Sequence, residues 1–292
     1  MSEEKGLAGL LERANLLLDR LDRLVPETKT ETDWSASTAF RWVSRNGRGI
    51  VEPVRHFHRV SLRDLKEVDA QKKTIRQNTR QFLAGHPANN VLLTGARGTG
   101  KSSLVKALLN EFAGRKLRLI EVEKQHLVEL PEIVDEVAER PERFILFCDD
   151  LSFNADEPGY KALKVVLDGS IAAASDNVLI YATSNRRHLM PEAMRDNLDT
   201  RYTDGEVHPA EAVEEKTSLS ERFGVWLSFY PFSQEQYLAI VAHWLAHYSV
   251  KDSPEVRQSA LNWARERGSR SGRAAWQFAR DCAGKARMKA EG

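Results

Sequence analysis

Residues 95–102 read Gly-Ala-Arg-Gly-Thr-Gly-Lys-Ser, which fits the pattern of a glycine-rich phosphate-binding loop without a mismatch. An apolar, strand-like stretch precedes this loop and a helix-forming stretch follows it, as the pattern requires. Glycines let such a loop point its amides at phosphate groups, and the start of the next helix adds partial positive charge. The lysine can reach the terminal phosphates, and the serine hydroxyl can ligate magnesium. The sequence therefore predicts a nucleotide site formed by Gly95, Ala96, Arg97, Gly98, Thr99, Gly100, Lys101, Ser102 and Ser103.

Two adjacent aspartates, Asp149 and Asp150, end the apolar stretch that begins at Phe144. A buried strand that ends this way near a phosphate-binding loop usually directs its acids at the metal ion. We expect Asp149 to hold Mg²⁺ together with Ser102, and Asp150 to orient or deprotonate an attacking water molecule. The alternative for either aspartate, stronger for Asp150, is that it caps the next segment.

The elements that must position these residues alternate between strands and helices. Strands are expected over 90–94, 117–122, 144–149, 177–183 and 225–230, and their separation by helix-length segments predicts a parallel sheet covered on both faces. After Pro231 the pattern predicts helices over 233–248, 254–267 and 272–288. The expected fold is α/β, a three-layer P-loop NTPase with an all-α lid. The expected domains are 1–61, an N-terminal helical and basic extension, 62–231, the nucleotide-binding domain, and 232–292, the lid.

Two parts of the N-terminal extension carry patterns of their own. Residues 7–25 place leucines at helical spacing, which predicts a helix that docks on its own domain or on another subunit. Residues 41–63 contain six arginines and one acid, interleaved with aromatic residues and histidines. Such a mixture can bind phosphates and stack on bases, so nucleic acid is one candidate partner. A solvated surface or a contact with an acidic neighbouring subunit explains the same composition.

With these motifs placed, the chain resembles the AAA+ family of ATPases, and more closely an uncharacterised bacterial clade of stand-alone AAA+ proteins, over roughly residues 62–288. Asn185, at the end of NVLIYATSN, matches the family's first sensor. Arg222, in SLSERFG, matches the arginine finger that completes a neighbouring subunit's site, and Arg273 matches the second sensor. Alternatives stay open: Asn185 can cap a helix, Arg222 can pair with a nearby acid such as Glu221, and Arg270 competes for the sensor role.

This resemblance implies ATP and Mg²⁺ as ligands and a homo-oligomer that shares its ATP sites between subunits. The second aspartate stands where much of the family has glutamate. A carboxylate displaced on the order of 1.5 Å can cost about a hundredfold in rate, so slow ATP turnover is expected. The segment 123–137 lacks the aromatic-hydrophobic-glycine loop of protein-unfolding rings. We therefore expect a slow ATPase that drives self-assembly or remodels a macromolecular partner. The alternative is a non-catalytic, nucleotide-gated adaptor or nucleic-acid-binding module; a small-molecule kinase is disfavoured.

Composition limits the remaining possibilities. The chain has 292 residues, a formal net charge of +1, 41% hydrophobic and 29% charged residues, and two cysteines. A near-neutral chain has no global attraction to polyanions, so binding to nucleic acid must depend on local patches. Two cysteines form no disulfide framework, and the sequence shows neither a signal peptide nor an apolar run of membrane-spanning length. These features predict a soluble cytoplasmic protein without a membrane partner.

Overall fold

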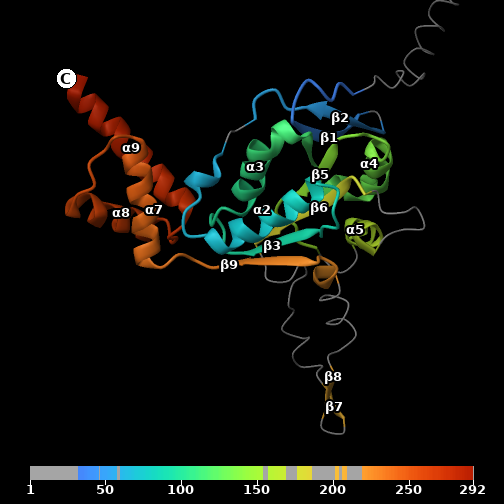
Figure 1. Ribbon diagram of the computed structural model, residues 1–292. Helices are drawn as coiled ribbons and strands as arrows, with labels where there is room; N and C mark the ends of the chain where they lie inside the picture. Colours follow the sequence, from blue (N-terminus) through green and yellow to red (C-terminus); the bar gives the residue numbers. More distant parts are fainter. Residues whose placement is uncertain are drawn as a thin grey trace, which may run out of the picture. The chain divides into compact units, whose positions relative to one another are not determined.

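The structure, a computed structural model, describes most of the chain (Figure 1). The described residues are 32–45, 47–57, 60–153, 157–168, 176–185, 201–203, 206–208 and 219–291. Residues Trp34–Gly292 form one compact unit. The helix expected over residues 7–25 lies outside the described residues. Within those ranges, no helix is both long and apolar enough to cross a membrane.

Seven strands form the main sheet, in the spatial order β2-β1-β4-β5-β6-β3-β9. All pairings from β4 to β9 are parallel, as the sequence predicts. Short strands rich in Val, Ile, Leu and Phe suit this position because both faces of a parallel sheet are buried. These five strands are β3 (Val91–Gly95), β4 (Leu117–Glu121), β5 (Arg143–Cys148), β6 (Val178–Ser184) and β9 (Val225–Phe229). A separate antiparallel pair consists of β7 (Arg201–Thr203) and β8 (Glu206–His208).

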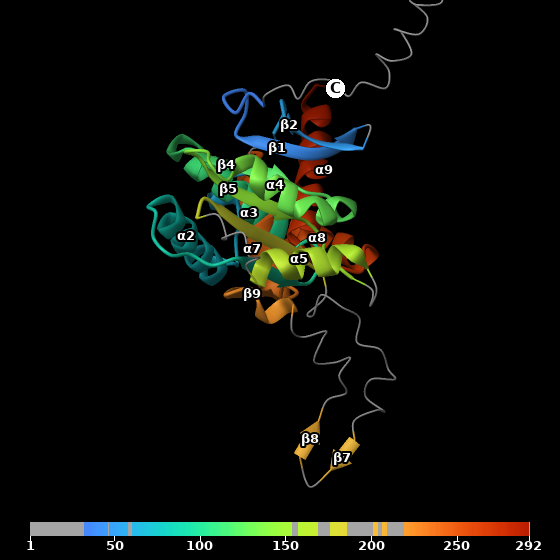
Figure 2. The same cartoon turned by 90° about the vertical axis from the view of Figure 1, so that its right-hand side faces the viewer.

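Helices cover both faces of the sheet, which confirms the α/β class (Figure 2). Helices α2 (Asp69–Leu83) and α3 (Lys101–Phe112) belong to one apolar core. Helices α4 (Leu130–Val137) and α5 (Pro158–Asp168) belong to the other. Because side chains alternate along a strand, neighbouring residues of β5 enter different cores: Ile145 packs with α2 and α3, whereas Leu146 packs with α4 and α5. Fully burying such a side chain contributes about 1.5–3 kcal/mol, so both helix layers are fixed to the sheet.

A hairpin of β1 (Ala39–Arg45) and β2 (Arg48–Pro53) extends the sheet beside β4. Trp42 of β1 is buried, and its Nε1 donates to Glu129 Oε2 at 2.5 Å. Its ring lies against Gly49, where an added Cβ would be only 1.6 Å from a ring carbon. These residues belong to the stretch that was expected to form an N-terminal extension, yet they are strands of the main sheet.

The three C-terminal helices pack against one another at the end of the sheet's last strand (Figure 1). They are α7 (Gln234–His247), α8 (Pro254–Glu266) and α9 (Gly272–Glu291), close to the ranges that the sequence predicts. A capping box starts α7: Ser233 Oγ accepts from the amide of Gln236, and the Gln236 side chain accepts from the amide of Ser233. This reciprocal pair stabilises the helix start by satisfying two amides that lack helical partners. Helices α7, α8 and α9 form the lid.

A buried polar cluster fixes α2 to β6, the strand that carries several site residues. The hydroxyl of Tyr181 accepts from Asn78 Nδ2 at 3.2 Å and lies 2.8 Å from Thr79 Oγ1. Burial raises the pKa of Tyr181 to about 12, although both hydrogen bonds oppose the shift. Because a buried hydroxyl without partners is costly, this cluster holds the strand in register with the helix.

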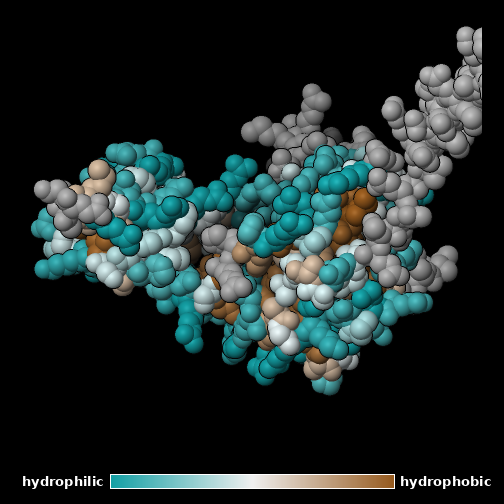
Figure 3. All heavy atoms as spheres, turned by 90° about the horizontal axis from the view of Figure 1, so that it is seen from above, coloured by the Kyte–Doolittle hydropathy of each residue, from teal (hydrophilic) through white to brown (hydrophobic). Residues whose placement is uncertain are grey.

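Most side chains on the face shown in Figure 3 are hydrophilic.

Candidate nucleotide-binding site

The glycine-rich loop connects the end of β3 to the start of α3. Gly95, Gly98 and Gly100 have φ angles of 123°, 73° and 101°, in the region that favours glycine. Gly95 also allows a close approach of β9, since an added Cβ would lie 1.9 Å from the Phe229 carbonyl oxygen. Gly100 precedes α3 without a side-chain cap, so the first amides of that helix have no capping side chain. This geometry is that of an anion-binding helix start.

Lys101 is buried at the base of the loop. Its Nζ donates to the carbonyl oxygens of Gly95 and Ala96, both at 2.8 Å, and to Asn185 Oδ1 at 3.0 Å. Burial lowers the pKa of Lys101 below its usual range, whereas the nearby carboxylates of Asp150 and Asp149 oppose that effect. The lysine is therefore fixed by oxygen atoms at the position where it can meet a phosphate.

Ser102 and Asp149 face each other across the site, with Ser102 Oγ donating to Asp149 Oδ1 at 2.6 Å. The same carboxylate oxygen accepts from Thr183 Oγ1 at 2.5 Å. Thr183 also accepts from the amide of Asp150 at 2.9 Å. One hydroxyl on β6 thus holds both aspartates of the neighbouring strand end.

Asp150 and Asn185 complete this cluster. Asn185 Nδ2 donates to Asp150 Oδ1 while Asn185 Oδ1 accepts from Lys101, so the amide bridges the loop lysine and the second aspartate. Asp150 has a φ of 53°, an uncommon conformation for a residue with a side chain. Such conformations persist where the surroundings enforce them and concentrate at functional sites.

A pocket of about 650 Å³ opens above the loop, between the sheet and the lid. Its volume lies within the usual range of small-molecule sites, about 300–1,000 Å³. The polar end contains the loop, both aspartates and Asn185, and the facing side, formed by the lid and by residues that precede α2 and α7, is more apolar. That apolar side is formed by Leu65, Val68, Phe232, Ile240, Trp244 and Trp276.

The lid touches the loop directly. The amide of Gly272 donates to the Gly98 carbonyl oxygen at 2.9 Å, and Ser271 lies so close that an added Cβ on Gly98 would be 2.8 Å from its Cβ. Arg273 follows on α9 and lines the pocket, whereas Arg270 is not among the described lining residues. The geometry therefore favours Arg273 over Arg270 as the lid arginine near the loop.

Arg222 lies away from its own chain's pocket. It precedes β9, at the opposite end of that strand from the loop, and the four residue steps of β9 alone span about 13 Å. Its Nε donates to Asp168 Oδ1 at the end of α5. Asp168 is thus one partner of Arg222, and it lies outside the local segment from which a partner was expected.

The remaining loop residues have separate positions. Arg97, Thr99 and Ser103 line the pocket, and Thr99 Oγ1 donates to the Ala96 carbonyl oxygen at 2.8 Å. Gly95 and Ala96 face β9 instead, because the Ala96 amide donates to the Phe229 carbonyl oxygen at 3.0 Å. The loop is thereby attached to the sheet on one side and open to the pocket on the other.

The donor set suits Mg²⁺ and phosphate. The Ser102 hydroxyl and the Asp149 carboxylate are hard oxygen ligands, and Mg²⁺ is usually held by one or two such groups together with substrate phosphates and water. No group of three or more His, Cys, Asp or Glu residues able to hold a metal ion occurs among the described residues. A site that relies on the nucleotide's own oxygens needs no such cluster.

Sequence reasoning missed Thr183 and Ser271. Thr183 lies on β6, two residues before Asn185, which directly follows the strand; the two-residue alternation of a strand predicts that both side chains are on one face. Ser271 caps α9 by accepting from the Ala274 amide, and its proximity to Gly98 brings together positions 173 residues apart in the sequence, which no local pattern reveals.

Comparison with known proteins agrees with this architecture. A family model described as "Protein of unknown function (DUF815)" matches residues 35–286. No curated protein matches the chain. The solved structure of the Aeropyrum pernix ORC1 protein in complex with DNA is similar with a TM-score of 0.53 at 17% identity, covering 76% of this chain and 61% of that one. The FIGL-1 AAA domain in complex with ADP is similar with a TM-score of 0.50 at 17% identity, covering 78% and 74%.

The Thermotoga maritima RuvB Holliday junction branch migration motor is similar with a TM-score of 0.48 at 16% identity, covering 75% of this chain and 63% of that one. The chain thus spans less than two thirds of the RuvB and ORC1 chains. Identities this low establish similarity of fold and not of activity. The parallel sheet, the loop and the helical lid match an AAA domain, so the chain has the AAA+ ATPase fold. Because the family model covers most of the sequence, the chain belongs to the DUF815 family.

Proposed function

We propose that this protein binds ATP with Mg²⁺ and hydrolyses it slowly, as a switch that controls self-assembly or the remodelling of a macromolecular partner. The observation that supports it most is the convergence of Lys101, Ser102, Asp149, Asp150 and Asn185, from three separate segments, at one end of the pocket. A binding loop alone requires only the first two of these residues.

Within this site, some residues would bind the nucleotide and others would take part in its hydrolysis. Lys101 and the first amides of α3 bind the β- and γ-phosphates. Ser102 and Asp149 would hold Mg²⁺, which when bound neutralises charge on those phosphates. Asp150 accepts a proton from, or orients, the attacking water, and Asn185 positions Asp150.

The lid contributes the other wall. Arg273, which lines the pocket, would meet the γ-phosphate, and Trp276 and Trp244 would offer apolar surface to the nucleotide base. Because the Gly272 amide donates a hydrogen bond to the Gly98 carbonyl oxygen, a movement of the loop would also move the start of α9. The lid would therefore differ in position between the ATP and ADP states.

Two features favour slow turnover. The carboxylate of Asp150 is one methylene shorter than the glutamate of faster relatives in this fold, and one of its oxygens already accepts from Asn185. A misplacement of this size costs about a hundredfold in rate. The arginine that matches the family's finger, Arg222, lies at the opposite end of β9 from the loop. A guanidinium that stabilises the transition state raises turnover by about 10³–10⁵ when another subunit supplies it. Hydrolysis would then require contact between copies.

The test is steady-state ATP turnover per subunit, measured over a thousandfold range of protein concentration. We expect the rate per subunit to rise with concentration and to vanish in Asp150→Asn. Arg222→Ala should keep the affinity for a fluorescent ATP analogue while losing turnover. Arg265→Ala, which removes an exposed arginine of α8, is the matched control and should behave as wild type. Equal loss of binding and turnover in Arg222→Ala would contradict the shared site. Binding of ATP without turnover at any concentration would leave the non-catalytic, nucleotide-gated adaptor as the function.

A further inference from the structure

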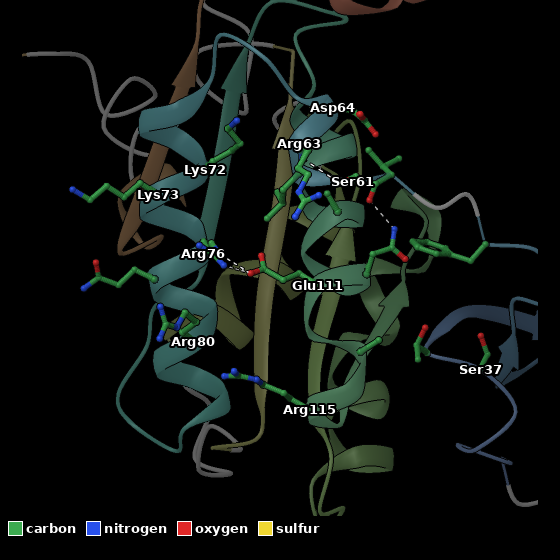
Figure 4. Close-up of a pocket in the computed structure, with 18 of the residues that line it drawn as sticks. Ser37, Ser61, Arg63, Asp64, Lys72, Lys73, Arg76, Arg80, Glu111 and Arg115 are labelled. Carbon is green, nitrogen blue, oxygen red and sulfur yellow. Dashed lines mark hydrogen bonds and ion pairs between the residues drawn. The ribbon is translucent and has the colours of Figure 1, made fainter. Parts of the chain in front are cut away.

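A second and larger concavity lies outside the nucleotide pocket, between helices α2 and α3 (Figure 4). Its volume is about 2,000 Å³, well above the range of sites built for one small molecule. Its walls are α2, the C-terminal end of α3, and the residues 54–57 and 60–64. We refer to this concavity as the α2–α3 groove.

The groove is strongly basic. It is lined by seven arginines and lysines but by two acids, Asp64 and Glu111. The seven are Arg55, Arg63, Lys72, Lys73, Arg76, Arg80 and Arg115. In a chain with a net charge of +1, this is a concentration of positive charge at one place.

Most of this charge lacks an acidic partner. Lys72 pairs with Asp69 at 2.6 Å, and Arg76 Nε donates to Glu111 at 2.6 Å. The other five cations form no ion pair within the described ranges of the chain. The groove therefore holds a surplus of cations that an anionic ligand could bind.

These cations are arranged in a row. Lys73, Arg76 and Arg80 lie three and four residues apart on α2, so they share one face at steps of about 4.5–6 Å along the helix. Arg115 approaches from the end of α3, and Arg63 lies near the other end of the groove (Figure 4). A linear series of charges fits a linear series of anionic groups better than a single ion.

The side-chain chemistry favours phosphodiesters in a single strand. Most of the cations are guanidinium groups, which bind phosphate oxygens in a bidentate manner. His56 and His86 are exposed at the groove, where imidazole rings can stack on unpaired bases.

This surface differs from the basic stretch 41–63 that the sequence singles out. Arg41 pairs with Glu121 at 3.3 Å, Arg45 pairs with Glu52 at 2.6 Å, and Trp42 is buried in the sheet. Arg41 and Arg45 are therefore paired with acids and Trp42 is inaccessible, whereas Arg55 and Arg63 line the groove together with the cations of α2.

We propose that the α2–α3 groove binds the sugar-phosphate backbone of single-stranded nucleic acid. The groove also adjoins the nucleotide pocket, since Val60 and Asp64 line both, and Asp64 lies 3.2 Å from His243 Nε2 of the lid. This contact connects the lid directly to a residue that lines the groove. The proposal names a partner class for the proposed function, but strand binding itself requires neither ATP nor hydrolysis.

The test is fluorescence anisotropy of a labelled, mixed-sequence 25-nucleotide single strand, as DNA and as RNA, with full-length protein and no nucleotide. If five cations contact phosphates, the logarithm of the association constant falls against the logarithm of salt concentration with a slope of about −3.5. That slope corresponds to a roughly 100-fold loss of affinity between 50 and 200 mM salt.

The variant Lys73→Ala/Arg80→Ala removes two exposed, unpaired cations and keeps good helix formers in α2. We expect its slope to fall to about −2.1 and its affinity at 50 mM salt to drop about 50-fold. The control Lys161→Ala/Arg265→Ala removes the same residue types from exposed positions on α5 and α8. It should bind as wild type, and thermal melts should show all three proteins folded.

Four results would overturn the proposal. One is the absence of binding at 50 mM salt by the wild type, and another is an equal loss of affinity in both double variants. The third is tighter binding of a 25-base-pair duplex than of the single strand. If Lys73→Ala/Arg80→Ala instead changes only self-association in sedimentation experiments, the groove binds an acidic surface of a second copy. Loss of ATP binding in Lys101→Ala with unchanged strand affinity would separate this proposal from the proposed function.

Discussion

Thr183→Val tests whether one hydroxyl on β6 holds both aspartates of the nucleotide site. In the structure that hydroxyl donates to Asp149 at 2.5 Å and accepts from the Asp150 amide at 2.9 Å. A hydrogen bond to a charged group contributes about 1.5–3 kcal/mol, and a buried amide left without a partner costs about 1–3 kcal/mol. Because the two effects act on one site that can relax, we expect the free energy of unfolding to fall by about 2–4 kcal/mol. Thr183 itself is 2% exposed, so water cannot easily replace the hydroxyl.

The assay is equilibrium unfolding in urea, with Thr183→Ser as the matched control. Serine keeps the hydroxyl and loses one buried methyl group, a change that costs about 0.5–1.5 kcal/mol. Valine fills the same volume without the hydroxyl, so the difference between the two variants reports the hydrogen bonds. If valine destabilises no more than serine does, Thr183 is a packing residue and the argument fails. Weaker magnesium dependence of ATP binding in Thr183→Val would show that the lost stability includes the orientation of Asp149.

Three further predictions concern the loop, the hairpin and a buried thiol. Gly98→Ala forces a side chain into a backbone with φ of 73° and places its Cβ 2.8 Å from Ser271, so affinity for a fluorescent ATP analogue should fall about 5- to 30-fold. Gly49→Ala puts a Cβ 1.6 Å from the Trp42 ring, and urea unfolding should show a loss of about 1–3 kcal/mol as the ring is displaced. Burial raises the pKa of Cys148 to about 12, so at pH 8 its reactive thiolate is scarce and iodoacetamide should modify it only after unfolding, as detected by mass spectrometry.

Two of these predictions have a matched control within the same chain. Gly114→Ala adds a Cβ with nothing within 4 Å and should leave stability within about 0.5 kcal/mol of wild type. Cys282 is only partly buried and should be alkylated in the folded protein before Cys148. Unchanged ATP affinity in Gly98→Ala would show that the loop does not depend on its left-handed conformation. A Gly49→Ala protein as stable as wild type, or equal alkylation of both cysteines, would contradict the burial described for Trp42 and Cys148.

The sequence alone predicted the glycine-rich loop, because the backbone requirement of each of its residues is local. Gly95, Gly98, Gly100, Lys101 and Ser102 are contiguous, and their backbone requirements follow from residue type. Strand periodicity likewise predicted β3, β4, β5, β6 and β9, since alternation and apolar runs are read within a few residues. Asp149 and Asn185 could be inferred as neighbours of the loop because the ends of parallel strands meet at one edge of a sheet.

Tertiary structure decided what depends on distant segments. The hairpin β1–β2 joins the sheet through pairing with β4, about 80 residues away, a contact that no local pattern encodes. Arg222 pairs with Asp168, 54 residues earlier. The cations of the α2–α3 groove come from positions 55–115, and only folding separates them from the arginines of β1, which acids of β2 and β4 neutralise. The composition of a sequence gives the number of its charges, whereas binding depends on which of those charges remain unpaired in the folded protein.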